Sequence, residues 1–375
     1  MLDLVIREFQ RRRILFADKL CPLFCASYCC HVFNLANRRT EAWVASGHPV
    51  DSRLHLLYVA PTGCGKNLYL EHFLEEGFGV LHGTLPTKFE GSMTEAGFVG
   101  TIKTLNGEVY ERPGLAREFS EGIVGIEEFS AITKHMSADY GLPLDTQLLS
   151  ALDSGRVVKR LGAGVIEYRT SITLWTATQP ARYELRSGLG RRFLFLCVLP
   201  TWQELQRIRR ERRRQKGVRL DPKALAEIQE KALAIKMGVQ DVRSVDFDIY
   251  DLMDQLGVPH WEEMLMERLA LGLFLARYGP ERHMTVVLSR EDEDVMALCA
   301  RWRRWTAFGA EKVLFLRVLR SVEPVNRHRF LDMMTHYGYD HGDSTRILAW
   351  LRQHGYVKNH ANRLETTRLA LELSI

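Results

Sequence analysis

The sequence lacks the features that mark membrane, secreted and disordered proteins. No stretch of its 375 residues is an apolar run long enough to cross a bilayer. Charged residues flank the apolar positions at the start of the chain and no cleavage-like site follows, so we expect no signal peptide. Apolar residues make up 46% and charged residues 26%, as in ordinary soluble proteins. We therefore expect a folded, cytoplasmic protein with two or three structural units.

The cysteine-rich segment near the start lacks the paired C-x-x-C motifs that usually mark a zinc site. Cys21, Cys25 and Cys29 recur every four residues, with Cys30 and His31 adjacent. On a helix, positions with this spacing share one face. We favour small thiols on a packed helix face, because free cysteine is commonly buried. A metal site is the alternative.

The chain also has little net charge. Its formal value of +5 is weak evidence for a polyanionic partner. The charges are unevenly distributed, however, with one dense run of arginine and lysine between Arg207 and Arg219. This run is either a solvated helix face or a contact with nucleic acid, since clustered arginines neutralise phosphates and release counterions.

No internal repeat or low-complexity segment divides the chain, so the expected units rest on changes of pattern. Residues 51–200 alternate apolar strands with helical patterns, which predicts a three-layer α/β unit with a mostly parallel sheet. It is preceded by a helical segment at 1–50 and followed by a helical segment at 201–310. We expect no membrane contact for any of them.

The last unit, residues 311–375, has the order helix, turn, helix and hairpin, which is a winged-helix pattern. Its first helix is expected at Arg327–Thr335, and Asp343 can cap the second. Such modules bind DNA but also pack protein against protein.

A glycine-bearing loop, A-P-T-G-C-G-K-N at Ala60–Asn67, directly follows the apolar run 54–59. A strand, such a loop and then a helix allow backbone N–H groups to surround a polyphosphate, and Lys66 would contact its β- and γ-phosphates. We therefore predict a nucleotide-binding loop; a structural turn is the alternative. The predicted binding residues are Thr62, Gly63, Cys64, Gly65, Lys66, Asn67 and Leu68.

Two further apolar strands end in polar residues: one in Glu127 and Glu128, the other in Gln179. Side chains beyond the ends of parallel strands lie in the crevice where ligands bind. Glu127 would hold Mg²⁺ and Glu128 would polarise the attacking water. Gln179 would bind the γ-phosphate or the water. Asn67 stands where a hydroxyl usually binds Mg²⁺, and its carbonyl can still hold a hard cation.

An arginine pair, Arg191 and Arg192, follows the flexible segment S-G-L-G. An arginine at this place could reach the nucleotide of a neighbouring subunit and offset charge in the transition state. Taken alone, such a pair would more often form a surface ion pair.

Together these elements resemble the AAA+ ATPases and, among them, the minichromosome maintenance (MCM) replicative helicases, over about residues 54–199. G-S-M-T-E-A-G-F-V-G-T-I at Gly91–Ile102 resembles the segment before the family's helix-2 insert, and Lys103–Tyr110 would form the hairpin of that insert. Leu148–Thr170 resembles the helix and pre-sensor hairpin, with Lys159 and Arg160 at the tip.

The resemblance implies an AAA+ core with both hairpins, a helical lid and a winged helix. It implies a DNA helicase or translocase of replication that binds ATP and Mg²⁺ between the subunits of a hexameric ring. Glu128, Lys66 and Gln179 would act in the subunit that binds the nucleotide, and Arg192 would act on its neighbour. The DNA backbone would be contacted by Lys103, Lys159 and Arg160.

Several residues depart from the family pattern. Ala60 replaces a glycine, Glu127 replaces an aspartate, and Trp261 falls where a sensor-2 arginine is expected. Only about fifty residues precede the sheet, so we expect the family's zinc-bearing N-terminal domain to be missing. With Asn67, these departures favour an alternative: a degenerate homologue that binds DNA or a partner without efficient hydrolysis. A protein remodeller is a third possibility, which the basic hairpin residues argue against.

Overall fold

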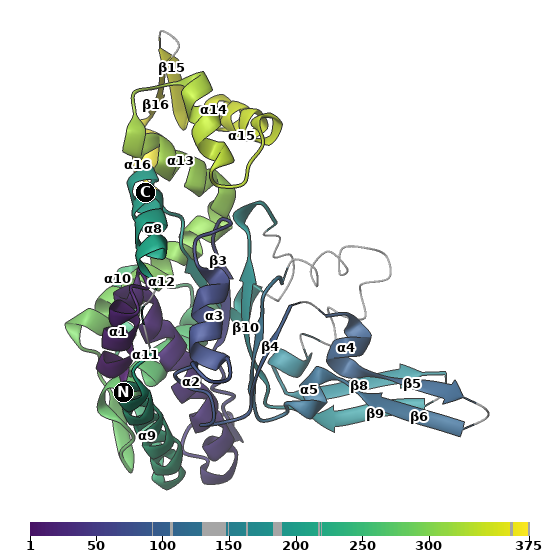
Figure 1. Cartoon of the computed structure of the whole chain (residues 1–375). Helices are drawn as coiled ribbons and strands as arrows, with labels where there is room; N and C mark the ends of the chain where they lie inside the picture. Colours follow the sequence, from purple (N-terminus) through teal and green to yellow (C-terminus); the bar gives the residue numbers. More distant parts are fainter. Residues whose placement is uncertain are drawn as a thin grey trace.

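The centre of the molecule is a five-stranded, wholly parallel sheet in the order β11-β3-β10-β7-β4 (Figure 1). The computed structural model describes residues 1–91, 93–105, 108–129, 148, 150–162, 164–182, 190–216, 218, 220–360 and 363–373. The strands are β3 His55–Val59, β4 Thr87–Glu90, β7 Ile123–Ile126, β10 Thr173–Thr178 and β11 Phe193–Cys197. All but β4 are buried on both faces, which explains their nearly continuous apolar sequences. The predicted α/β class with a parallel sheet is confirmed.

Two helices precede the sheet, α1 (Leu2–Arg11) and α2 (Ala17–Thr40). The sequence predicts helices at Asp3–Leu20 and Pro22–Ala45, but the break between the two helices lies at residues 12–16, earlier than predicted. It falls there because Arg13 and Phe16 have φ angles of 58° and 66°, outside the helical region. Pro22 lies inside α2, so the helical ladder lacks the hydrogen bond that an N–H at this position would donate to the carbonyl of Asp18.

Helix α2 is buried almost throughout because it packs between the sheet and α11 (Glu263–Tyr278). A Cβ at Gly272 of α11 would collide with the carbonyl oxygen of Ala26, so the two helices can approach this closely only with glycine there. The predicted packed face of thiols is confirmed: Cys21, Cys25, Cys29 and Cys30 are fully buried and form no disulfide.

Helices dominate the chain after the sheet, as predicted for 201–310. Beyond the predicted pattern, β12 (Ser244–Phe247) and β13 (His283–Val286) form a short parallel pair. The helices of this part are α8 Trp202–Arg214, α9 Pro222–Gly238, α10 Tyr250–Leu256, α11, α12 Arg290–Phe308 and α13 Ala310–Val322. In the part of the chain that the structure describes, no helix has the length and apolar character needed to span a bilayer.

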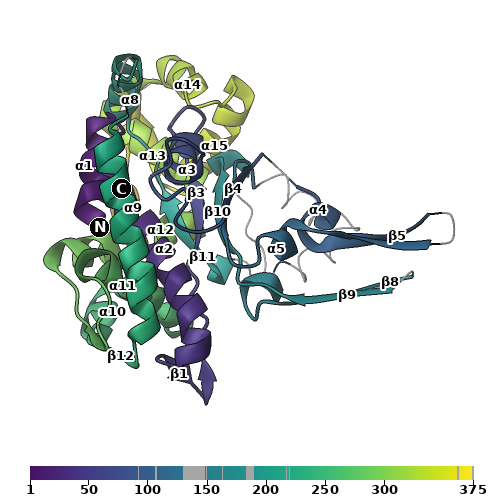
Figure 2. The ribbon, with the colours of Figure 1, turned by 60° about the horizontal axis from the view of Figure 1, so that its bottom comes forward.

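Helices α1, α2, α9 and α11 lie on one side of the sheet, and two antiparallel hairpins extend from the other side (Figures 1 and 2). We call these two hairpins the arm. The first joins β5 (Gly100–Leu105) to β6 (Glu108–Pro113), and its turn, Asn106-Gly107, lies outside the described residues. The second joins β8 (Arg156–Leu161) to β9 (Gly164–Arg169). The Tyr168 hydroxyl donates to the carbonyl of Val99 over 3.0 Å, which ties the hairpins together at their base.

The C-terminal module, residues 323–373, combines helices with a three-stranded antiparallel sheet in the order β14-β16-β15. Its first helix is α14 (Arg327–Thr335), at the predicted bounds. The prediction that Asp343 caps the second helix is wrong. Asp340 is the cap, because it precedes the first helical residue and accepts from the backbone N–H of Asp343 over 2.7 Å. The other elements are β14 Val325–Asn326, α15 His341–Gln353, β15 Val357–His360, β16 Arg363–Thr366 and α16 Arg368–Leu371.

Candidate nucleotide-binding site

The carboxyl ends of β3, β7 and β10 meet at one edge of the sheet, and backbone hydrogen bonds continue beyond the strands. The N–H of Ala60 donates to the carbonyl of Thr178 over 3.2 Å, so the loop after β3 begins beside the end of β10. The N–H of Glu127 donates to the carbonyl of Glu90 over 2.9 Å, which holds the end of β7. The residues after these strands are therefore fixed next to one another, in the crevice where parallel α/β sheets bind ligands.

The glycine-bearing loop needs glycine at two points. Gly63 and Gly65 have φ angles of 77° and 84°, a region that other residues rarely adopt. Gly65 also caps α3 (Lys66–Leu74), so the first N–H groups of this helix lie at the loop. A helix N-terminus attracts anions because these N–H groups have no partner within the helix. The Lys66 ammonium donates to the carbonyl of Ala60 over 2.9 Å, which keeps its charge over the loop.

Cys64, between the two glycines, points inward and is 4% exposed. Burial raises the pKa of its thiol to about 12, although the charges of Lys66 and Arg209 oppose this. The side chain therefore packs as a neutral group and is not a nucleophile at physiological pH.

A cavity of about 500 Å³ opens over this loop and brings most of the predicted site together. Thr62–Leu68, Glu127, Glu128 and Gln179 all line it. The side-chain amide of Asn67 donates to the carboxylate of Glu127, so the two residues predicted to share a metal ion touch each other. Three of the four predicted catalytic residues, Lys66, Glu128 and Gln179, thus face one space.

Other residues of this cavity were not predicted from the sequence. Glu71 lies one helical turn after Asn67, and burial together with the charges of Glu75 and Glu127 raises the pKa of its carboxyl. The spacing along α3 was the signal that could have identified it. The remaining wall comes from the turn between α1 and α2 and from α8. These residues are Arg13, Ile14, Leu15, Phe16, Ile208, Glu211, Arg212 and Gln215, and Tyr69 of α3 also lines the cavity.

The wall formed by the turn and α8 is held by polar contacts. Arg13 forms an ion pair with Glu211 over 3.3 Å, and the side-chain amide of Gln215 donates to the carbonyl of Arg13 over 3.1 Å. Residues some 200 positions apart in the chain therefore close one side of the cavity. Arg212 adds a positive charge to that side.

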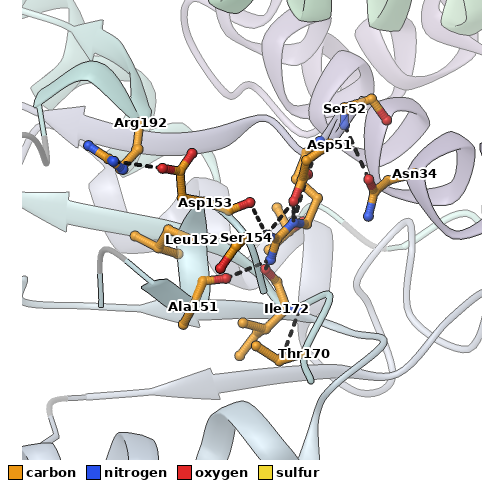
Figure 3. A network of polar contacts seen from close by, with 12 residues as sticks. Asn34, Asp51, Ser52, Ala151, Leu152, Asp153, Ser154, Thr170, Ile172 and Arg192 are labelled. Atoms are coloured by element: carbon orange, nitrogen blue, oxygen red, sulfur yellow. Dashed lines mark hydrogen bonds and ion pairs between the residues drawn. The ribbon is translucent and has the colours of Figure 1, made fainter. Parts of the chain in front are cut away.

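Arg192 does not line this cavity. It immediately precedes β11, so it lies at the amino edge of the parallel sheet, whereas the cavity lies at the carboxyl edge. Its guanidinium forms an ion pair with Asp153 over 2.8 Å (Figure 3). Arg192 is therefore remote from the cavity of its own chain, and its action on a neighbouring subunit stays a prediction.

Next to Asp153 lies a buried network around the start of β3 (Figure 3). The guanidinium of Arg53 is fully buried, forms an ion pair with Asp51 and donates to the carbonyls of Ala151 and Ile172 over 3.0 and 2.8 Å. Burial would raise the pKa of the Asp51 carboxyl, but the charge and hydrogen bonds of Arg53 outweigh it and lower this pKa to about 2. The network fixes the amino edge of the sheet beside Arg192.

The predicted DNA contacts lie on the arm, with one correction. Leu161 pairs with Gly164 in the last pair of the ladder, so Lys159 and Arg160 lie on β8 before the tip. Lys159 lies on the same face of β8 as buried Val157, because the two residues are two positions apart on the strand. Its ammonium group donates to the carbonyl of Gly100, at the start of β5, over 3.4 Å. Arg160 is exposed on the other face. The side chain of Lys103 lies outside what the structure describes.

Trp261, at the position where the resemblance implies an arginine, is far from this chemistry. It is 53% exposed and lines a separate apolar cavity together with Phe195 and Met266. Arg212, which the sequence places only in a basic run, is an arginine of the helical segment 201–310 that lines the cavity over the glycine-bearing loop.

The cavity suits the predicted ligands by size and by chemistry. Its volume falls in the range of small-molecule sites, roughly 300–1,000 Å³. Lys66 and the N-terminus of α3 provide positive potential at one end, where a triphosphate would bind. The predicted metal residues, Asn67 and Glu127, also line the cavity and carry the side-chain oxygens that Mg²⁺ prefers.

Fold and site together define a parallel α/β protein with a candidate phosphate-binding loop opposite a pair of carboxylates. A scan of the sequence against models of known protein families finds no match, and a search of curated proteins finds none either.

Proposed function

We propose that the protein is an MCM-like AAA+ ATPase, a DNA helicase or translocase of replication that binds ATP and Mg²⁺ in the cavity at the carboxyl edge of the sheet. The single observation that carries this proposal is the convergence of Lys66, Glu127, Glu128 and Gln179 on one cavity. These residues come from three different strand ends, and each has the chemistry that one step of phosphoryl transfer requires.

In this proposal Lys66 and the backbone of the loop bind the triphosphate, while Asn67 and Glu127 hold Mg²⁺. Glu128 orients and polarises the attacking water, and Gln179 binds the γ-phosphate or that water. Arg192 reaches the nucleotide of the next subunit in a hexameric ring. Its place at the sheet edge remote from its own cavity is consistent with that role.

The arm carries the proposed DNA contacts, Lys103, Lys159 and Arg160. Contacts to phosphates make binding insensitive to base sequence and sensitive to salt. The basic residues occur among acidic ones, such as Glu167, which pairs with Arg156 over 2.7 Å. We therefore expect a small number of phosphate contacts and a correspondingly shallow salt dependence for the arm.

The test is ATP hydrolysis by the full chain with and without single- and double-stranded DNA, compared with Lys66→Ala and Glu128→Gln. We expect Lys66→Ala to lose nucleotide binding, because the ammonium group that would contact the β- and γ-phosphates is then missing. Glu128→Gln should keep nucleotide binding but lower kcat by about 10²–10⁴-fold, the usual contribution of a general base. Equal background phosphate release by all three proteins would remove the support for an ATP-driven enzyme.

DNA use is tested by Lys159→Gln combined with Arg160→Gln. The matched control is Arg169→Gln, an exposed arginine at the base of the same hairpin. We expect the double variant, and not the control, to lose stimulation of hydrolysis by DNA. Unchanged stimulation would instead favour a protein substrate, for which exposed Val109 and Tyr110 of β6 offer an apolar contact.

One observation favours a second candidate, a homologue that binds nucleotide without efficient turnover. Asn67 offers its side-chain N–H group to Glu127, so the two potential metal ligands bond to each other. This candidate predicts that ATP binds the wild type and fails to bind Lys66→Ala, while Glu128→Gln and the wild type release phosphate equally slowly.

A further inference from the structure

The exposed face of α8 carries four arginines that the proposed ATP site does not use, and we call them the arginine stripe. Arg207, Arg210, Arg213 and Arg214 are all exposed. Their spacing of three and four residues places them on one side of the helix. The other side faces the protein through buried Leu205 and through residues that line the ATP cavity.

These charges have few partners within the molecule. No described carboxylate lies within ion-pair distance of Arg207, Arg210 or Arg213, and Arg214 shares Glu211 with Arg13. The segment 201–216 contains seven basic and two acidic residues, a surplus equal to the net charge of the entire chain. Favourable interaction with the helix dipole accounts for basic residues in the last turn only.

The stripe also stores repulsion, because like charges three and four positions apart on a helix destabilise it. Arg210 lies three positions from both Arg207 and Arg213, and four positions from Arg214. An anionic partner with closely spaced charges would relieve this repulsion, and a polyphosphate backbone has that property.

The position of α8 separates the stripe from the arm. In both views of the molecule α8 lies on the side of the sheet away from β5, β6, β8 and β9 (Figures 1 and 2). A short DNA segment held by the arm would therefore leave the stripe uncovered.

We propose that the arginine stripe is a second nucleic-acid-binding surface, which contacts the phosphate backbone independently of the arm. Protein interfaces have an apolar, charge-depleted centre, whereas no large apolar side chain between 201 and 216 is strongly exposed. The planar guanidinium fork of arginine matches phosphate geometry. This goes beyond the proposed ATPase, since it requires neither nucleotide nor hydrolysis.

The test uses the full chain carrying Lys159→Gln and Arg160→Gln, so that the arm contributes little. Two variants of this arm-neutralised protein are compared. The stripe variant also carries R207Q/R210Q/R213Q/R214Q, and the control variant carries four changes of exposed basic residues elsewhere, K223Q/K231Q/R282Q/R290Q. Binding of a fluorescent 30-nucleotide single strand is measured by anisotropy between 50 and 200 mM salt without nucleotide. Circular dichroism checks that each variant is folded.

We expect the arm-neutralised protein and the control to bind the strand equally, and the stripe variant to bind it at least tenfold more weakly. The slope of log K against log salt should become shallower by about 3, since each lost contact to single strands removes about 0.7. A smaller variant, Arg210→Glu with Arg213→Glu, should also weaken binding if four changes disturb folding.

Three results would overturn the inference. Two of them, equal affinity of the stripe and control variants and absence of binding by the arm-neutralised protein, leave the proposed ATPase intact. The third is that polyglutamate, compared at equal total charge, competes as well as the DNA strand, which would identify the stripe as a surface for acidic proteins.

Discussion

At the scale of single residues, two buried histidines hold the sheet together in their neutral form. His31 bonds Thr173 of β10 through Nδ1 over 2.8 Å and the carbonyl of Glu121 through Nε2 over 3.1 Å. His55 of β3 bonds the carbonyl of Leu152 over 3.1 Å. Burial lowers the pKa of His31 to about 4 and that of His55 to about 3, because no water solvates the charged ring.

We predict that His31 makes the protein sensitive to acid. Its folded-state pKa is depressed below the unfolded value of about 6.5, so its stabilising contribution is complete above that pH and is lost as the pH falls toward 4. At about 1.4 kcal/mol per pKa unit, His31 contributes roughly 3 kcal/mol to this pH dependence. Chemical denaturation at pH 7, 5 and 4 measures it.

In that experiment His31→Gln should lose about 3 kcal/mol less stability than the wild type between pH 7 and pH 4. Exposed His48 provides the control, and His48→Gln should follow the wild type at every pH. Parallel curves for wild type and His31→Gln would show that His31 is not held neutral by the fold.

The sequence identified those site residues whose position follows from the local chain. Glu127 and Gln179 each follow a strand directly and Lys66 follows the loop after β3, so the sheet edge determines where they lie. Arg13 and Arg212 reach the same cavity only because the turn after α1 meets α8 across the fold, and no local pattern carries that information.

At the scale of elements, the arm depends on one glycine at its base. Gly155 precedes β8 with φ of +67°, and a Cβ there would collide with the carbonyl oxygen of Thr170. The N–H of Thr170 donates to the carbonyl of Gly155 over 2.7 Å, which closes the hairpin at this point. Both the φ angle and the close approach therefore require glycine.

We predict that Gly155→Ala lowers the free energy of unfolding by about 2–4 kcal/mol, since it adds left-handed strain to a backbone collision. Gly162, at the other end of the same hairpin, has no atom within 4 Å of an added Cβ and no positive φ, so Gly162→Ala should change stability by less than about 0.5 kcal/mol. Equal midpoints in urea for both variants would contradict the argument.

The sequence predicted elements best where apolar periodicity and turn chemistry agree. Strands β3, β7 and β10 appear where expected, because each is a short apolar run bounded by turns, and hairpins β5–β6 and β8–β9 lie in the segments that the family resemblance implied. The break at 12–16 was missed because Arg13 and Phe16 carry no glycine or proline signal. The pair β12–β13 was missed because its strands are too short to outweigh the helical pattern around them.

At the scale of the whole molecule, the buried apolar residues form one continuous core from Leu2 to Ala370. The C-terminal module is part of it and also reaches the candidate site. Tyr337 is 2% exposed, and its ring centre lies 6.4 Å from that of Trp202 in α8. An added Cβ at Gly338 would lie 3.5 Å from the hydroxyl of Thr62, so the backbone of this turn rests beside the glycine-bearing loop. No sequence pattern links positions 62 and 338.

This juxtaposition predicts that the C-terminal module senses ligand in the glycine-bearing loop. Saturating ATP analogue should slow amide hydrogen exchange at residues 336–339 by about 3–10-fold, because openings that separate the turn from the loop must then also release the ligand. When the analogue concentration is 100 times its Kd, ligand binding can slow this exchange by at most about 100-fold. The hairpin β15–β16, at the far end of the module, should exchange at an unchanged rate. Lys66→Ala should abolish the protection at residues 336–339. If the ligand protects only residues 62–68 in the wild type, the two segments touch without being coupled, and the prediction is wrong.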